Sequence, residues 1–246
     1  MLADVDMKKI KFAIVKFGAT NHLCDYKRLK SWKSQLFEIQ SVYSIDNPPD
    51  DDIVDGYWDL KYSRERMRGF ITCPNDCDIA VAIMPYRFVD NFYMHRVSSN
   101  VAVISLYGIR EILAEDDISI ENFVLKQFYE LTAIKHIMED ISDDEVYNLV
   151  HRDTRRCLFD MNGDRMDILY NTEHPCICEE CKSKFKKKQV ATNVISLFEK
   201  ELKKLRKPFI ARLEKLIRSY PFISLICSLL SAVLVNILAN YICQFF

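Results

Sequence analysis

The stretch 151–181 constrains this chain more than any other, because four of its nine cysteines gather there in a polar, charged segment. Cys178 and Cys181 have the C-x2-C spacing that presents two thiolates to one tetrahedral Zn²⁺. His151 and Cys157 lie upstream at an interval that suits the other half of such a site. A bound metal would give this polar loop a stability that burial cannot supply.

Two further side chains leave the ligand set open. His174 and Cys176 lie beside the C-x2-C pair and compete for one of the four places. Disulfides are the other common use of clustered cysteines, but inside cells such clusters are more often metal sites. We therefore predict a structural Zn²⁺, with the ligands His151, Cys157, Cys178 and Cys181.

Strand and helix patterns alternate over roughly the first 180 residues. Apolar, β-branched runs predict strands, and apolar residues at helical spacing predict helices. Ser119 is a suitable N-cap for the longest helix. The resulting fold class is α/β or α+β, a single compact mixed domain. The expected strands are 11–17, 38–45, 77–84 and 100–106, and the expected helices are 27–37 and 119–140.

With this order of elements, the cysteine segment resembles the archaemetzincin group of metalloprotease-like proteins. Members of that group carry a second, cysteine-rich zinc site downstream of the catalytic helix, closed by a C-x2-C pair at a comparable interval. Here the strand 101–106 precedes the long helix, and the metal segment follows it. The resemblance covers residues 80–185 and implies an archaemetzincin-like domain over residues 1–188.

The chain departs from the catalytic pattern of that group. An active member needs H-E-x-x-H-x-x-G-x-x-H, in which two histidines on one helix face bind zinc and the glutamate activates water. The corresponding helix here contains Glu130 and His136, but the chain has no H-E-x-x-H. We therefore expect a protein that is not an enzyme. The alternative is a membrane-bound zinc hydrolase or peptidase with a rearranged site of Glu130, His136 and a third ligand.

Residues 221–246 carry no charge. As a helix rising ~1.5 Å per residue, this segment would reach about 39 Å, more than a hydrocarbon core of ~30 Å. The stretch 182–218 holds 13 Lys or Arg against three Glu, whereas residues 1–181 hold 21 basic and 32 acidic groups. Positively charged flanks stay on the cytoplasmic side. We expect a single-pass protein of the cell inner membrane with its N-terminal domain in the cytoplasm.

Residues 189–220 read as a basic, amphipathic helical neck that is interrupted at Pro208. Its lysines and arginines suit anionic lipid headgroups, and we expect no nucleic-acid partner. In the following segment, every fourth residue is small or polar, as in helices that associate closely. This row predicts a homo-oligomer and consists of Ser224, Ser228, Ala232, Asn236, Asn240 and Gln244.

Together these features predict a non-catalytic, tail-anchored membrane protein. Its cytosolic zinc-bound domain would sense a small signalling ligand or a partner protein, and its transmembrane helix would oligomerise to perturb or permeabilise the membrane. Such an architecture resembles effectors of bacterial antiviral defence. The remaining alternative is a membrane scaffold for a partner enzyme. The chain has no G-x-S-x-G, Walker or G-x-G-x-x-G motif that would indicate other catalytic classes.

Overall fold

In the computed structural model, residues 8–49, 60–205, 213–214 and 217–243 are described. The chain forms two compact units, Met1–Arg206 and Lys207–Phe246. The first unit is a mixed α/β domain, as the sequence predicted. It extends past the domain end expected at residue 188, because the helix that follows is packed into it.

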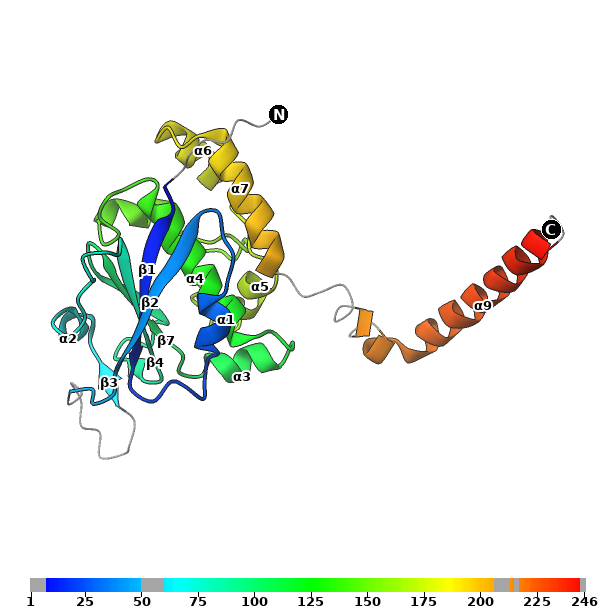
Figure 1. Cartoon of the computed structure of the whole chain (residues 1–246), viewed down its shortest axis with the longest axis horizontal. Helices are drawn as coiled ribbons and strands as arrows, with labels where there is room; N and C mark the ends of the chain where they lie inside the picture. The colour runs from blue at the N-terminus through cyan, green and yellow to red at the C-terminus, as the bar shows by residue number, and fades with distance from the viewer. Residues whose placement is uncertain (1–7, 50–59, 206–212, 215–216, 244–246) are drawn as a thin grey trace. The chain divides into compact units, whose positions relative to one another are not determined.

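A five-stranded sheet forms the centre of the first unit (Figure 1). Its order is β2-β1-β4-β7-β6, and all neighbouring strands are parallel except β6, which runs antiparallel to β7. Every residue of β4 and β7 is buried, which explains why both strands are apolar on both faces. The strands are β1 Ile10–Phe17, β2 Phe37–Ile45, β4 Ile79–Met84, β6 Met94–Ser98 and β7 Val101–Ser105.

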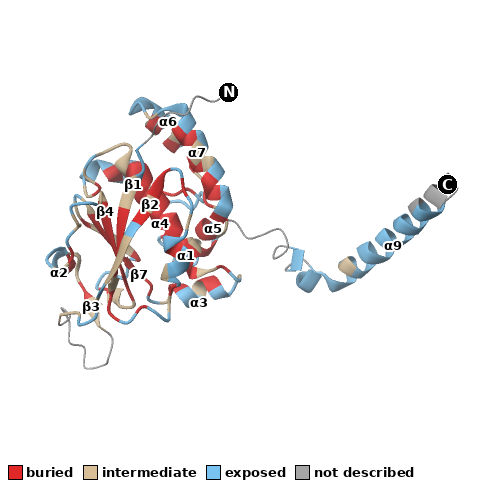
Figure 2. Ribbon diagram, viewed as in Figure 1, coloured by how far each residue is buried: buried red, intermediate tan, exposed pale blue. Residues whose placement is uncertain are grey.

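Helices cover one face of this sheet and enclose the larger core (Figure 2). The central helix α4, Ile120–Lys135, is buried over nearly its whole length. Its Phe128 ring packs edge-on against Phe12 of β1, with centroids 4.8 Å apart. Figure 1 shows the other helices of this layer beside α4. They are α1 Tyr26–Lys30, α3 Ile109–Ala114, α7 Thr192–Leu202 and the 3-10 turn η2 Lys203–Leu205.

The opposite face carries a smaller core beneath helix α2, Arg64–Arg68, and a two-stranded ribbon. The ribbon pairs β3, Lys61–Tyr62, with β5, Arg87–Phe88. The segment between Lys135 and α7 contains the predicted metal ligands, His151 to Cys181. Its elements are the 3-10 helix η1 Asp144–Leu149, α5 Asp167–Glu173 and α6 Glu179–Lys187.

Two predicted helices are shorter than expected. The helix predicted at 27–37 ends at Lys30, with Ser31 as its C-cap, and by Gln35 the backbone N–H bonds to the distant Glu201 carboxylate. Trp32 donates from Nε1 to the hydroxyl of Tyr129 at 3.0 Å. The helix predicted at 119–140 ends at Lys135 with His136 as its C-cap. The stretch 47–56, which is acidic and contains two prolines and is expected to form a loop, lies mostly outside the described residues.

Helix α7 is the first half of the predicted neck, and it belongs to the first unit. Its apolar stripe packs against α4, so the periodic pattern marks a domain face. Glu201 of α7 is 1% exposed and fixes this contact. Its carboxylate accepts hydrogen bonds from Ser34 Oγ, the Gln35 backbone N–H and the Tyr129 hydroxyl. The predicted break at Pro208 lies outside the described residues.

The second unit contains helix α9, Pro221–Cys243. Among the residues that the structure describes, no helix has the length and apolar character needed to cross a membrane. The predicted transmembrane helix and the inner-membrane localisation are therefore wrong. The row Ser224, Ser228, Ala232, Asn236 and Asn240 lies on α9, and Gln244 lies outside the described residues.

Candidate metal centre and adjoining cleft

The structure brings together the four side chains that the sequence singled out as metal ligands. One donor atom from each of His151, Cys157, Cys178 and Cys181 lies within 4.8 Å of the other three. Cys178 is the N-cap of α6 and Cys181 lies in its first turn, so one helix start presents both thiols. His151 and Cys157 come from the loop that follows η1.

The distances within this group match a tetrahedral zinc site. His151 Nε2 lies 3.1 Å from Cys181 Sγ and 3.2 Å from Cys178 Sγ. The Sγ atoms of Cys157 and Cys181 are 3.9 Å apart. Ligands around Zn²⁺ at about 2.0–2.3 Å stand roughly 3.5–3.8 Å from one another. The donor set and its spacing fit Zn²⁺, and one imidazole with three thiolates fills all four positions of a structural site.

Short backbone pairings hold the upstream ligands in place. His151 pairs with Asp160, through His151 N–H to the Phe159 carbonyl at 3.0 Å and Met161 N–H to the His151 carbonyl at 2.8 Å. Cys157 pairs in the same manner with Cys176. These bridges position the ligands through backbone hydrogen bonds, which explains how a polar loop can present a buried histidine and a buried thiol.

The local electrostatics favour a thiolate at Cys157. A hydrogen bond from the Cys181 thiol, together with bonds from backbone N–H groups, lowers the pKa of Cys157 to about 5. The Cys178 N–H points at the Cys157 sulfur from 3.4 Å. Metals bind thiolates rather than thiols, so these donors prepare the site for a cation.

A carboxylate lies behind the histidine ligand, outside the site. Glu180 Oε2 lies 3.9 Å from His151 Nδ1 and accepts a 2.6 Å hydrogen bond from Arg155. A carboxylate behind a metal-bound imidazole fixes its orientation and raises its basicity. The lysine and arginine partners of Glu180 hold the pKa of this exposed carboxyl group at about 2, so it stays ionised at neutral pH.

The competing ligands that the sequence left open are not part of the centre. His174 lies next to Glu173 instead, with 3.9 Å between its Nε2 and the carboxylate. Cys176 directs its sulfur towards the Arg155 carbonyl at 3.9 Å, and burial raises its pKa to about 11. Neither side chain belongs to the metal group.

The structure also tests the rearranged second site. His136 packs against the Phe198 ring, with centroids 5.9 Å apart, and burial lowers its pKa. Glu130 instead faces Arg96, whose Nη1 lies 3.6 Å from Oε1. Within the described ranges, the His151 group is the only set of three or more potential ligands close enough to share an ion. Glu130 and His136 therefore do not assemble the predicted second metal site.

A cleft of about 400 Å³ adjoins the metal centre. Glu130 of α4 and Asp160 of the metal loop line it, together with arginines from separate parts of the chain. Apart from Glu130, which the sequence assigned to the alternative rearranged zinc site, none of these side chains was singled out from the sequence, because they come from distant segments that share no motif. The lining of the cleft includes Arg64, Arg96, Glu130, Arg152, Phe159 and Asp160.

A buried lysine lies close to this cleft. Lys126 of α4 is 1% exposed, and burial lowers its pKa. Burial raises the pKa of the neighbouring Glu130, while Lys126 and Arg96 oppose that rise. Buried groups with opposed shifts of this kind gather at functional sites more often than elsewhere. Periodicity alone assigns both residues to an apolar helix face.

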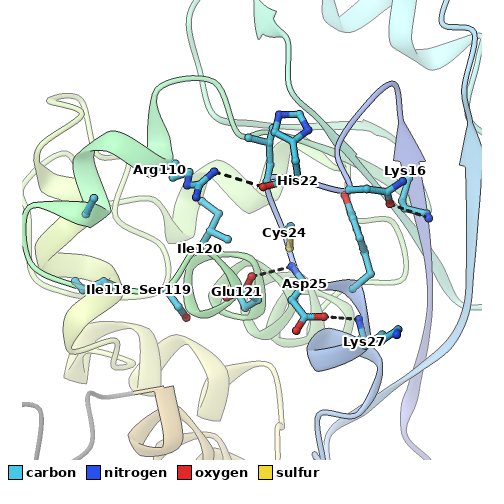
Figure 3. Close-up of a pocket in the computed structure, with 14 residues that line it drawn as sticks. Lys16, His22, Cys24, Asp25, Lys27, Arg110, Ile118, Ser119, Ile120 and Glu121 are labelled. Atoms are coloured by element: carbon cyan, nitrogen blue, oxygen red, sulfur yellow. Dashed lines mark hydrogen bonds between the residues drawn. The ribbon is translucent and has the colours of Figure 1, made fainter.

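A larger hollow of about 760 Å³ lies at the start of α4 (Figure 3). Its polar groups are mutually engaged: Arg110 Nη1 donates to the His22 carbonyl at 3.4 Å, and the Asp25 N–H donates to Glu121 at 2.8 Å. Burial raises the pKa of the Cys24 thiol beneath it, so that sulfur is a weak nucleophile. The polar groups of this hollow that are described above bond to one another, so the hollow is a weaker candidate for a ligand site than the cleft beside the metal centre.

No protein-family model matches the chain, and no curated protein matches it. Among solved structures, the crystal structure of archaemetzincin from Methanopyrus kandleri is similar, with a TM-score of 0.48 and 14% identity. The match covers 74% of this chain and 96% of that chain. An archaemetzincin is thus a structural neighbour.

That neighbour corrects one expectation. The sequence predicted a protein that is not an enzyme, whereas the similar structure is an archaemetzincin, from the metalloprotease-like group named above. The match contradicts the prediction, and we withdraw it. A likeness at this identity and TM-score assigns no reaction to this chain.

Proposed function

We propose that the first unit is a zinc-stabilised ligand-binding domain, in which the structural Zn²⁺ builds one wall of the cleft. One observation carries this proposal. The five-residue stretch 157–161 contributes Cys157 to the metal centre and Asp160 to the cleft. The metal therefore holds the loop that lines the binding site.

Hydrogen bonds join the two sites within this loop. Asp160 Oδ2 accepts the backbone N–H of Arg155 at 2.7 Å and that of Cys157 at 3.0 Å. The carboxylate is thus tied to the peptide group of a metal ligand. Loss of the ion would leave Cys157 without its metal bond. Because the Cys157 N–H bonds to Asp160, the position of Asp160 in the cleft would then change.

Metal analysis of matched cysteine variants tests the structural role. The full chain is expected to contain one zinc per chain, and Cys181→Ser is expected to lose it. Because β1 and β4 also pack in the smaller core on the opposite face, which contains no residue of the metal segment, hydrogen exchange should accelerate in residues 149–187 of that variant and stay slow in these strands. Cys176→Ser is the control, since this nearby thiol lies outside the metal group and should keep zinc and exchange protection.

Other outcomes would overturn the proposal. Two zinc ions per chain, or full zinc content in Cys181→Ser, would exclude a single structural site at these ligands. Hydrolysis of test peptides by the zinc-loaded chain, lost together with zinc in Cys181→Ser but retained in Cys176→Ser, would replace the structural role with a catalytic one.

We also propose that the second unit mediates self-association. Large apolar side chains are exposed along α9, among them Phe222, Leu229 and Val235. Exposed apolar area of this extent favours burial against another surface. Mass photometry of the full chain and of residues 1–206 should show a multimer that is lost on truncation. A full-length monomer would exclude self-association, and an unchanged multimer after truncation would exclude α9 as its cause.

A further inference from the structure

The floor of the cleft contains a buried acceptor without a donor. Asp160 is 3% exposed, and its Oδ2 is held by two backbone N–H groups. Its Oδ1 is buried and has no hydrogen-bond partner among the described residues. An unpaired buried acceptor costs about 1–3 kcal/mol. The carboxylate is therefore fixed in orientation, and one oxygen stays available for an N–H or O–H donor.

The cleft also holds two arginines with unused donors. The Nε of Arg64 is buried without a partner, and Arg152, an exposed residue, makes no ion pair or side-chain hydrogen bond within the described ranges. Guanidinium groups match phosphate and carboxylate oxygens with two parallel hydrogen bonds. The arginine side of the cleft therefore suits an anionic group.

Aromatic side chains contribute to the walls. Phe92 and Tyr147 line the cleft and expose their rings, while Phe159 is buried beneath. The Arg96 guanidinium lies 5.9 Å from the centre of the Tyr147 ring, which keeps that ring in place. Exposed aromatic faces stack on planar heterocycles, at about 1–3 kcal/mol per nucleic-acid base.

We propose that this cleft binds a nucleotide-like small molecule, with a planar ring whose N–H group donates to Asp160 and a phosphate group that meets Arg64 and Arg152. The inference rests on the proposed binding function and names its ligand class. A volume of about 400 Å³ lies within the range of small-molecule sites. Lone phosphate would leave Asp160 unpaired, and a neutral nucleoside would leave the arginines unused.

Calorimetric titration of the zinc-loaded full chain tests the proposal. The probes are guanosine monophosphate, adenosine monophosphate, guanosine, inorganic phosphate and tyrosine. One of the two monophosphates should bind at least about tenfold more tightly than guanosine or phosphate, because each lacks one of the two anchoring groups. Its affinity should fall with rising salt, as expected when arginines hold a phosphate.

Three substitutions separate the anchoring groups. Asp160→Asn keeps an oxygen for the Arg155 and Cys157 N–H groups but turns an amide donor into the cleft, so monophosphate binding should weaken by about ten- to a hundredfold. Arg64→Gln and Arg152→Gln should each weaken it by about tenfold. Arg110→Gln, which makes the same change of charge in the other hollow, should leave the affinity unchanged.

Zinc content and melting temperature are measured on every sample. If a variant has lost zinc, its result tests the proposed structural metal and not the ligand class. The binding comparison then relies on Arg152→Gln, because this exposed side chain can be changed without disturbing the core. Several results would overturn the ligand class: no binding of either monophosphate to zinc-loaded protein, tighter binding of tyrosine, phosphate binding as tight as that of a monophosphate, or equal weakening by Arg110→Gln.

Discussion

Two buried carboxylates pack around helix α4, and their surroundings differ. Glu201, 1% exposed, accepts hydrogen bonds at both oxygens, including those from Ser34 Oγ at 2.5 Å and Gln35 N–H at 2.8 Å. Glu130, 6% exposed, lines a cleft and has two cations near it, Lys126 and Arg96, with 3.6 Å between its carboxylate and the Arg96 guanidinium. Both are acidic residues in a helix, yet only Glu201 is solvated by protein donors.

This difference separates a structural role from a site that is prepared for binding. A buried charge is tolerated when donors of the protein replace its water, as they do at Glu201. Near Glu130 the loss of water around the carboxylate is compensated only in part. Burial raises the pKa of Glu130 and lowers that of Lys126, so the neutral form of each group is favoured more than in water. The comparison predicts that removal of the first carboxylate costs stability and that removal of charges beside the cleft does not.

The largest effect is expected for Glu201→Ala. The change leaves the buried Ser34 hydroxyl, the Gln35 N–H and the Tyr129 hydroxyl without their acceptor, and should lower the free energy of unfolding by about 3 kcal/mol. Urea unfolding measures the loss. Glu199→Ala on the same helix removes an exposed carboxylate paired with Lys182 and should cost at most about 1 kcal/mol. Equal losses in both variants would show that Glu201 does not brace α7.

The second largest effect is expected for Lys126→Met, which should raise the stability of the protein. Burial lowers the pKa of Lys126 in the folded state. At pH values between this lowered pKa and the unfolded pKa of about 10.4, the unfolded chain binds more protons than the folded chain. Stability should therefore rise with pH through this window. Lys126→Met should remove the rise and stabilise the protein at neutral pH by about 1 kcal/mol, because a buried cation with incomplete pairing is replaced by an apolar chain.

Thermal unfolding at several pH values checks this prediction. Lys200→Met, at an exposed position of α7, is the control and should leave both the stability at neutral pH and its pH dependence nearly unchanged. A marked loss of stability in Lys126→Met would mean that the ammonium group is well paired. The contrast between the two carboxylate regions would then be lost.

The sequence predicted the parts of the molecule that depend on local pattern. The strand core 79–84 follows from an apolar run, and the closeness of Cys178 and Cys181 follows from their C-x2-C spacing, so both signals lie within a few residues. Trp32 illustrates the opposite case. It lies within the predicted amphipathic pattern, yet the helix ends at Lys30 and the Trp32 side chain donates to Tyr129, a contact that no local pattern indicates.

The cleft could not be predicted for the same reason. Arg64 begins α2, Arg96 lies in β6 and Asp160 lies in the metal loop, so only the tertiary fold brings these side chains together. Asp160 lies three residues after the metal ligand Cys157, but its place in the cleft follows from its contacts with residues 151 and 155–157. No spacing rule connects those positions.

The smallest effect is expected for Glu130→Gln. Burial raises the pKa of Glu130, so its neutral form is favoured over a wider pH range than in the unfolded chain, and the amide reproduces that form. Stability at neutral pH should change by less than about 1 kcal/mol. In the wild type, stability should fall as pH rises from the unfolded value of about 4.3 through the higher folded pKa, and the variant should lack this fall.

Glu201→Gln is the matched substitution at the other carboxylate. There the amide nitrogen must face a hydroxyl or a backbone N–H that already donates, so the same change of one atom should cost about 2 kcal/mol. Chemical unfolding of both variants at neutral pH compares them directly. If Glu130→Gln destabilises the protein as much as Glu201→Gln, then Glu130 is paired as fully as Glu201. Glu130 would then no longer count as an incompletely paired polar group of the cleft.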